Sequence, residues 1–293
     1  MAQQRLPIIG LEVDESPSEA VQRAAFEAAG IEVEIERWDR RPHQLADAIA
    51  MLRKDKSAIG AMIHSPHKEK VVALLDALSD DARASGAANV VVRDGTKLRG
   101  HNTDADGIRA GLLSVLPKVK GKWPRQAVVL GAGGGARAAV AVLIQSGFQH
   151  VSVFNRHLHK AEALVSHFGR SARHMELRAR PWHEAILEAE LAKAPVLIHA
   201  TAETDPNASP LSEEILPEGL AVLDLSLSAI PTALMRAAKA HGGSVANGQA
   251  SFLAASGVAF RLWTKQEAAS GVMKSALNAV MGTPEAEDTV VGD

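Results

Sequence analysis

The chain has 293 residues, of which 46% are apolar and 23% are charged, and its formal net charge is −2. This length is enough for two domains, and the charge gives no electrostatic reason to expect a nucleic-acid or anionic-membrane partner. The chain contains no cysteine and no tyrosine, which excludes disulfides, thiolate nucleophiles, cysteine-ligated zinc and tyrosine-based catalysis. No signal core or membrane span is evident, so we expect a cytoplasmic protein.

Strand-like and helical patterns alternate along the first 116 residues. Apolar or alternating runs predict strands at residues 6–13, 31–38 and 57–64. Helical spacing predicts helices at residues 18–30, 43–55, 68–86 and 105–116. Ser18 is a candidate N-cap of the first helix, and Asp94-Gly95 is the expected turn of a hairpin. This alternation predicts an α/β layer with a mostly parallel sheet.

The rest of the chain begins with a basic connection at residues 117–126. Buried strands are predicted at residues 127–130, 150–156, 194–201 and 219–227. Helices are predicted after residue 135 and at residues 159–168, 250–266 and 271–282, before a polar tail at 283–293. We therefore expect two α/β domains, one from residues 1–104 plus 247–293 and the other from residues 105–246. The C-terminal helices should pack back on the first domain.

A glycine-rich turn follows the strand predicted at residues 127–130. Gly131 permits a tight turn, and Gly133 allows a pyrophosphate to approach the backbone at the start of an Ala-rich helix. The candidate cofactor-binding residues of this GxGxxA segment are Gly131, Ala132, Gly133, Gly134, Gly135 and Ala136. The alternative is an ordinary βα turn. The strand and helix around the motif favour a Rossmann-type dinucleotide domain.

The end of the next predicted strand distinguishes the two nicotinamide cofactors. An NAD site places Asp or Glu there to bind the ribose hydroxyls, whereas this chain has Asn155 and Arg156, followed by Lys160. The planar, always charged fork of Arg156 suits a 2′-phosphate. The alternative is a solvated basic helix start, and we favour NADP over NAD.

Three segments together point to a family. "PHK" at residues 66–68, "GHNTDADG" at 100–107 and "GAGGGARAA" from residue 131 resemble the shikimate dehydrogenase family over essentially the whole chain, in order. The resemblance implies that Lys68 and Asp104 are the pair beside the hydroxyl that becomes a ketone. Without it, Lys68 reads as a helix-start lysine and Asp104 as a helix N-cap.

The resemblance also implies substrate and cofactor contacts. The family's S-x-S pair, which holds the substrate carboxylate, matches Ser16 and Ser18, and Asn89 matches the residue that binds a ring hydroxyl. Helix capping and a hairpin start are the alternatives for these residues. The N-A-T-x-x-G-M loop beside the nicotinamide reads HATAETD at residues 199–205, so Thr201 is retained and the family's Asn is replaced by His.

Departures from the family pattern fall on substrate contacts. The Asn and Thr of N-V-T-x-P-x-K are replaced by Met62 and His64, a Tyr by Leu227, and a Gln by Ala255. A buried substrate hydroxyl that loses its partner costs roughly 1–3 kcal/mol. These changes predict a divergent member that prefers a shikimate-related hydroxy or keto acid, with His64 facing the altered substituent.

Several other functions remain possible from the sequence. One alternative is a biosynthetic shikimate dehydrogenase, and another is a weakly active binding or regulatory paralogue. Glutamyl-tRNA reductase requires a cysteine that this chain lacks, and methylene-tetrahydrofolate dehydrogenase fits the N-T-D and S-x-S motifs poorly. A metal site at His64, His67 and His101 lacks the usual zinc spacing, so we expect no metal. We expect a monomer or homodimer with a small-molecule hydroxy or keto acid as its substrate, and no nucleic-acid or membrane partner.

Overall fold

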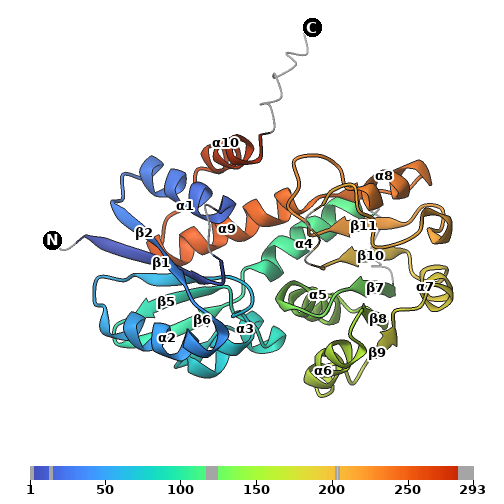
Figure 1. The fold of residues 1–293 in the computed structure, drawn as a ribbon, viewed down its shortest axis with the longest axis horizontal. Helices are drawn as coiled ribbons and strands as arrows, with labels where there is room; N and C mark the ends of the chain where they lie inside the picture. The colour runs from blue at the N-terminus through green and yellow to red at the C-terminus, as the bar shows by residue number, and fades with distance from the viewer. Residues whose placement is uncertain (1–2, 13–15, 117–124, 202, 204, 283–293) are drawn as a thin grey trace, which may run out of the picture.

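A computed structural model describes residues 3–12, 16–116, 125–201, 203 and 205–282. Within these residues the chain forms two six-stranded sheets, one in each of two lobes (Figure 1). None of the helices in the described part is long and apolar enough to cross a membrane. The polar tail predicted at residues 283–293 and most of the connection at 117–126 lie outside the described residues.

The first sheet has the strand order β2-β1-β3-β5-β6-β4. Its strands are β1 (Gln4–Gly10), β2 (Val33–Asp39), β3 (Gly60–Ile63), β4 (Ala77–Leu78), β5 (Val90–Asp94) and β6 (Lys97–His101). Its helical segments are α1 (Pro17–Ala28), η1 (Pro42–Gln44), α2 (Leu45–Lys54), η2 (Lys70–Leu74) and α3 (Asp80–Ser85). Pairs β1–β2, β1–β3 and β4–β6 are parallel, and the predicted β5–β6 hairpin is antiparallel.

One predicted helix of this lobe is wrong in part. Residues 68–86 form η2, the short strand β4 and α3 instead of one helix. The Asp76 carboxylate accepts a 2.7 Å hydrogen bond from Leu98 N–H, which brings this segment to the edge of β6. Ser79 then starts α3 by accepting a hydrogen bond from Ala82 N–H at 3.2 Å. These long-range and capping contacts override the helical spacing of the segment.

The second sheet has the order β12-β11-β10-β7-β8-β9, with every pair parallel. Its strands are β7 (Gln126–Leu130), β8 (His150–Asn155), β9 (Glu176–Pro181), β10 (Val196–His199), β11 (Ala221–Asp224) and β12 (Val245–Ala246). Its helical segments are α5 (Gly134–Gln145), α6 (Leu158–Phe168), α7 (Glu184–Leu191), η3 (Glu213–Ile215) and α8 (Ala233–Ala240). The chain reverses its direction of winding between β7 and β10, the place where doubly wound sheets bind their ligands.

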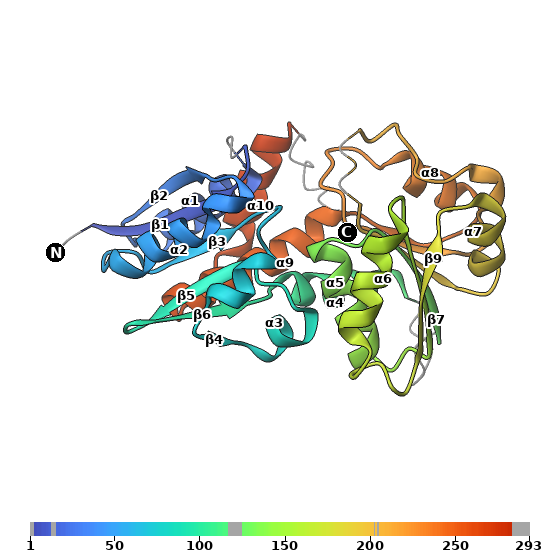
Figure 2. The same cartoon turned by 60° about the horizontal axis from the view of Figure 1, so that its bottom comes forward.

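The two C-terminal helices, α9 (Gly248–Thr264) and α10 (Ser270–Met281), pack on the first lobe, as predicted (Figure 2). Gln22 Nε2 on α1 donates a 2.9 Å hydrogen bond to the Ser256 carbonyl on α9. The rings of Phe26 and Phe260 lie 5.2 Å apart between their centroids. These contacts close one apolar face of the first sheet.

Helix α4 (Asp104–Val115) lies beside α9 between the two lobes (Figure 1). Gly107 makes this close approach possible, because a Cβ at that position would lie 2.1 Å from the Ser251 carbonyl oxygen. All strands of the first sheet lie within residues 4–101 and those of the second within 126–246. We propose the domain division at residues 104/105 and 246/247 on this basis.

Candidate active site

The structure brings Lys68 and Asp104 together from two places in the first lobe. Lys68 lies in the turn after β3, and Asp104 begins α4 just beyond β6. Lys68 Nζ donates a 2.7 Å hydrogen bond to Asp104 Oδ2, and the two side chains are 24% and 22% exposed. This partial exposure leaves the ion pair accessible to a small molecule.

Asn89 positions the aspartate of this pair. Its Nδ2 donates 2.9 Å hydrogen bonds to Asp104 Oδ1 and to Thr103 Oγ1, and its Oδ1 accepts one from Thr103 N–H at 2.8 Å. Both amide hydrogens of Asn89 are therefore engaged within the protein. Thr103 belongs to the N-T-D motif, but no sequence pattern predicted that it would support Asn89.

His64 lies at the same site, directly after β3. Burial disfavours its charged form and Lys68 repels it, so the pKa of His64 falls to about 4 although Asp104 partly offsets the effect. The imidazole is consequently neutral near pH 7 and offers one donor and one acceptor nitrogen. The charges of Lys68 and Asp104 both act on His64, so its imidazole lies within electrostatic range of the proposed proton-handling pair.

The serine pair follows β1, whose carboxyl end lies next to that of β3 in the sheet. Ser16 caps α1 by accepting a 3.3 Å hydrogen bond from Glu19 N–H, whereas Ser18 lies within the helix. The N-cap prediction at Ser18 is therefore wrong by two residues, because Pro17 occupies the first turn and fixes the start of the helix. Both serines are partly exposed.

The apolar replacements lie in or near a hydrophobic cluster of the first lobe. Met62 is 5% exposed and packs in that cluster, and Leu227 is partly buried against it. Ala255 on α9 is 7% exposed. These side chains offer no polar group where the family resemblance implies Asn, Tyr and Gln.

The glycine turn lies at the reversal point of the second sheet. Gly131 has a φ of +115°, and a Cβ there would lie 2.3 Å from the Ala200 carbonyl oxygen beyond β10. Gly133 is the N-cap of α5 without a side-chain cap, and nothing lies within 4 Å of its would-be Cβ. Free N–H groups and open space at this helix start fit a pyrophosphate. Ala132 and Ala136 are buried behind the turn.

The glycine turn meets the Lys68 segment across the two lobes. A Cβ at Gly134 would lie 3.1 Å from Lys68 Cδ, so the lysine stem rests on the start of α5. Beside this contact, Arg137 Nε and Glu69 Oε2 form a 3.1 Å ion pair that the sequence did not predict. Residues so far apart in sequence carry no local signal of such a pair.

The three residues proposed for the cofactor's ribose phosphate lie at the end of β8 and the start of α6. Asn155 Nδ2 donates a 3.0 Å hydrogen bond to the His157 carbonyl. Arg156 and Lys160 are exposed, and neither forms an ion pair with any described residue. Two cations without a carboxylate partner suit a dianionic phosphate.

Thr201 is part of a buried network that the sequence did not reveal. His199 Nδ1 lies 2.9 Å from Asp224 Oδ1, and His199 Nε2 lies 2.5 Å from Thr201 Oγ1. His199 and Asp224 are 2% and 0% exposed, and Asp224 Oδ2 accepts a 2.6 Å hydrogen bond from Thr232 Oγ1. Burial opposes ionisation, but hydrogen bonds from His199 and Thr232 hold the pKa of Asp224 below its ordinary value. This network fixes the loop after β10 next to Gly131.

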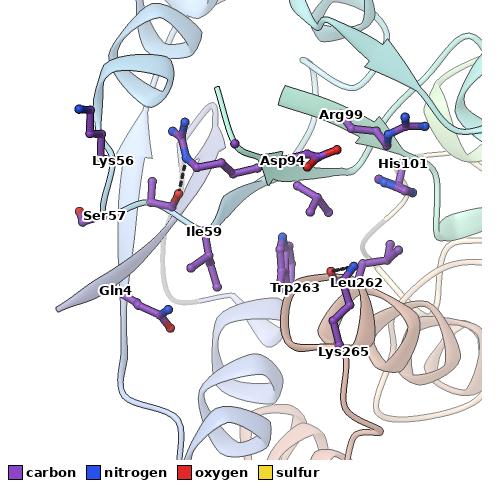
Figure 3. A pocket seen from close by; sticks show the side chains of 14 residues that line it. Gln4, Lys56, Ser57, Ile59, Asp94, Arg99, His101, Leu262, Trp263 and Lys265 are labelled. Carbon is purple, nitrogen blue, oxygen red and sulfur yellow. Dashed lines mark hydrogen bonds between the residues drawn. The ribbon is translucent and has the colours of Figure 1, made fainter. Parts of the chain in front are cut away.

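The three histidines considered for a metal do not form a metal site in the structure. Among the described residues, no group of three or more His, Cys, Asp or Glu side chains is arranged to hold an ion. His67 is buried, and its Nε2 lies 2.7 Å from the Arg40 carbonyl oxygen. His101 instead lines a cavity between the β5–β6 hairpin and the end of α9 (Figure 3).

A parallel doubly wound sheet with this glycine turn, facing a lysine–aspartate pair on the first lobe, defines a two-domain oxidoreductase of the Rossmann type. Residues 8–91 match the family model for the shikimate dehydrogenase substrate-binding domain. Residues 116–226 match the model for shikimate/quinate 5-dehydrogenase. The chain belongs to this family of dehydrogenases.

Similar proteins cover nearly the whole chain. The shikimate dehydrogenase (NADP⁺) of Symbiobacterium thermophilum is 34% identical over 284 residues, 95% of each chain. The Thermus thermophilus shikimate 5-dehydrogenase structure with NADP(H) and shikimate is 33% identical, with a TM-score of 0.78, covering 94% of this chain and 99% of that one. Quinate dehydrogenase from Corynebacterium glutamicum with NAD is 27% identical, with a TM-score of 0.81, covering 94% and 99%.

Proposed function

We propose that the protein is an NADP-dependent shikimate dehydrogenase, which interconverts shikimate and its 3-keto form. The observation that supports this most is the contact between the Lys68 stem and Gly134 at the start of α5. It puts a proton-handling pair beside the helix start that is proposed to bind the cofactor pyrophosphate. The names of the curated relatives agree with this proposal better than with an altered substrate.

In this proposal NADP⁺ supplies the hydride acceptor, and the chain's own residues handle the proton. Ser16 and Ser18 donate their hydroxyl hydrogens to the substrate carboxylate. The substrate hydroxyl lies against Lys68 and Asp104. As the carbon loses hydride, Lys68 takes the hydroxyl proton and passes one of its own to the Asp104 carboxylate. Asn89 keeps the Asp104 carboxylate in place through a 2.9 Å hydrogen bond. The reverse reaction returns the proton from the same pair to the carbonyl oxygen.

Steady-state kinetics of the intact protein test the proposal. With NADP⁺ and shikimate we expect a kcat/KM of about 10⁴ M⁻¹s⁻¹ or more, the usual range for enzymes on their own substrates. Quinate and deoxygenated or aminated shikimate analogues serve as comparisons. A kcat/KM for one of these well above that for shikimate would overturn the assignment of shikimate as the substrate.

Replacing the proposed phosphate-binding arginine should change cofactor preference. We expect Arg156→Ala to raise the Kd of NADPH about 10- to 100-fold and to change that of NADH little, because only NADPH carries the 2′-phosphate. Binding titrations followed by cofactor fluorescence measure both values. Arg170→Ala, at another exposed arginine of the same lobe, is the matched control. Equal losses for both cofactors in Arg156→Ala would contradict the phosphate role.

A second candidate function is the oxidation of a related hydroxy acid that carries a different ring substituent. Its support is the neutral His64 beside Lys68 and Asp104, where the family resemblance implies a Thr. Under this candidate, His64→Thr should raise kcat/KM for shikimate about tenfold and lower it for the preferred analogue, because each unmatched buried hydroxyl costs ~1–3 kcal/mol. A fall in shikimate turnover in His64→Thr would instead support the first candidate.

A further inference from the structure

A cavity of about 770 Å³ opens on the first lobe, between the β5–β6 hairpin and the end of α9 (Figure 3). This volume is within the range of small-molecule sites. None of the residues proposed above to contact substrate or cofactor lines it. The cavity is therefore separate from the proposed active site.

The apolar part of this cavity is held in a fixed geometry. Trp263 Nε1 donates a 2.9 Å hydrogen bond to the Val91 carbonyl oxygen, which anchors the indole. Position 60, next to this hydrogen bond, must be glycine, because a Cβ at Gly60 would lie 2.0 Å from the Val91 carbonyl oxygen and 2.8 Å from Trp263 Nε1. Figure 3 shows the indole between Ile59 and Leu262. A planar or aliphatic group would find a preformed wall here.

The polar part of the cavity is positively charged. Its charged lining consists of four cationic side chains and one carboxylate, namely Lys56, Arg93, Arg99, Lys265 and Asp94. Within the described part of the chain, none of these cations forms an ion pair. The Arg93 guanidinium donates to backbone carbonyls, including that of Ala58 at 2.7 Å, and Lys265 Nζ donates to the Leu262 carbonyl at 3.0 Å. The Arg99 guanidinium has no hydrogen-bond partner among the described residues.

The pKa of His101 reflects the positive charge around the cavity. Burial lowers its pKa, and the nearby charges of Arg99 and Lys265 lower it further. Figure 3 shows these three side chains on the same side of Trp263. A concave site with unpaired positive charge on a protein of net charge −2 attracts small anions.

We propose that this cavity binds a small organic anion, a phosphate or carboxylate that carries an aromatic or aliphatic body. Arg99 and Lys265 bind the anionic group through charge-assisted hydrogen bonds, and the body packs against Trp263 and Leu262. Such a ligand contacts both the cations and the apolar wall. Inorganic phosphate can contact the cations alone, and a neutral aromatic compound can contact only the wall.

Phenyl phosphate is a suitable probe, measured by calorimetry on the full chain with saturating NADPH and shikimate, a pair that fills the proposed active site but cannot react. We expect saturable binding that is weaker for inorganic phosphate and for phenol. Arg99→Ala combined with Lys265→Asn should raise the Kd about tenfold or more. Asparagine is chosen because Lys265 has a φ of +63°, which asparagine tolerates. Arg170→Ala, at an exposed arginine outside the cavity, should leave the Kd unchanged.

Benzoate in place of phenyl phosphate tells which anionic group is preferred, and either result supports the site. Absence of saturable binding by both probes, or equal binding by the wild type and the double variant, would overturn the proposal. The proposal would also be overturned if sedimentation showed a dimer that only the double variant dissociates, because a second copy would then cover the cavity.

Discussion

Replacing Lys68 with methionine should lower kcat for shikimate oxidation about 10²- to 10⁴-fold, the usual contribution of a general acid or base. Methionine keeps much of the stem that rests on Gly134 but removes the ammonium group that Asp104 binds at 2.7 Å. The KM for NADP⁺ should change little, because the lost interaction acts in the transition state. Steady-state rates followed by NADPH absorbance give both values.

Lys70→Met is the matched control for this prediction, because Lys70 is an exposed lysine two residues further along. It should keep wild-type kcat within a factor of about two, as surface substitutions away from a site usually do. Asp104→Asn should behave like Lys68→Met, since either change removes the ion pair. A Lys68→Met enzyme with kcat within tenfold of the wild type would remove this residue from the mechanism.

Replacing Asp224 with alanine should lower the free energy of unfolding by about 3–5 kcal/mol. The substitution leaves His199, the Thr232 hydroxyl and Ser226 N–H without their buried acceptor. Urea unfolding of both proteins measures the loss. Asp47→Ala, at an exposed position in α2, should cost less than about 1 kcal/mol.

The loss in Asp224→Ala should depend on pH. The pKa of Asp224 is lowered in the folded state from an ordinary value of 3.8. A carboxylate of this kind stabilises the fold above its unfolded pKa and loses that contribution as the pH falls through the folded value. The difference between wild type and variant should therefore be largest near neutral pH and shrink below about pH 4. A difference that grows on acidification would contradict the role of the Asp224 carboxylate as a buried hydrogen-bond acceptor.

The sequence predicted the features that depend on local pattern. The Rossmann turn at Gly131, the α/β class, the hairpin at Asp94-Gly95 and the two C-terminal helices are all present in the structure. Each depends on residue types that are adjacent or regularly spaced in the chain. The family was identified from three short motifs, and the comparisons confirm it.

Features that depend on contacts between distant segments could not be predicted. The helix expected at residues 68–86 is broken because Asp76 bonds to β6. The Arg137–Glu69 ion pair and the His199–Asp224 pair join elements whose spacing in sequence carries no signal. Strands β9 and β12 were missed because one is half-polar and the other is only two residues long. The sequence indicated the chemistry of Lys68 and Asp104 only through the family resemblance.

We propose that the carbon bearing the hydroxyl group beside Lys68 and Asp104 gives its hydride to NADP⁺. Shikimate deuterated at carbon 3 tests this most directly, with mass spectrometry of the cofactor after a single turnover. NADPH should then carry the deuterium, and Lys68→Met should slow the appearance of this label. NADP⁺ that remains unreduced, or NADPH formed without the label, would contradict it.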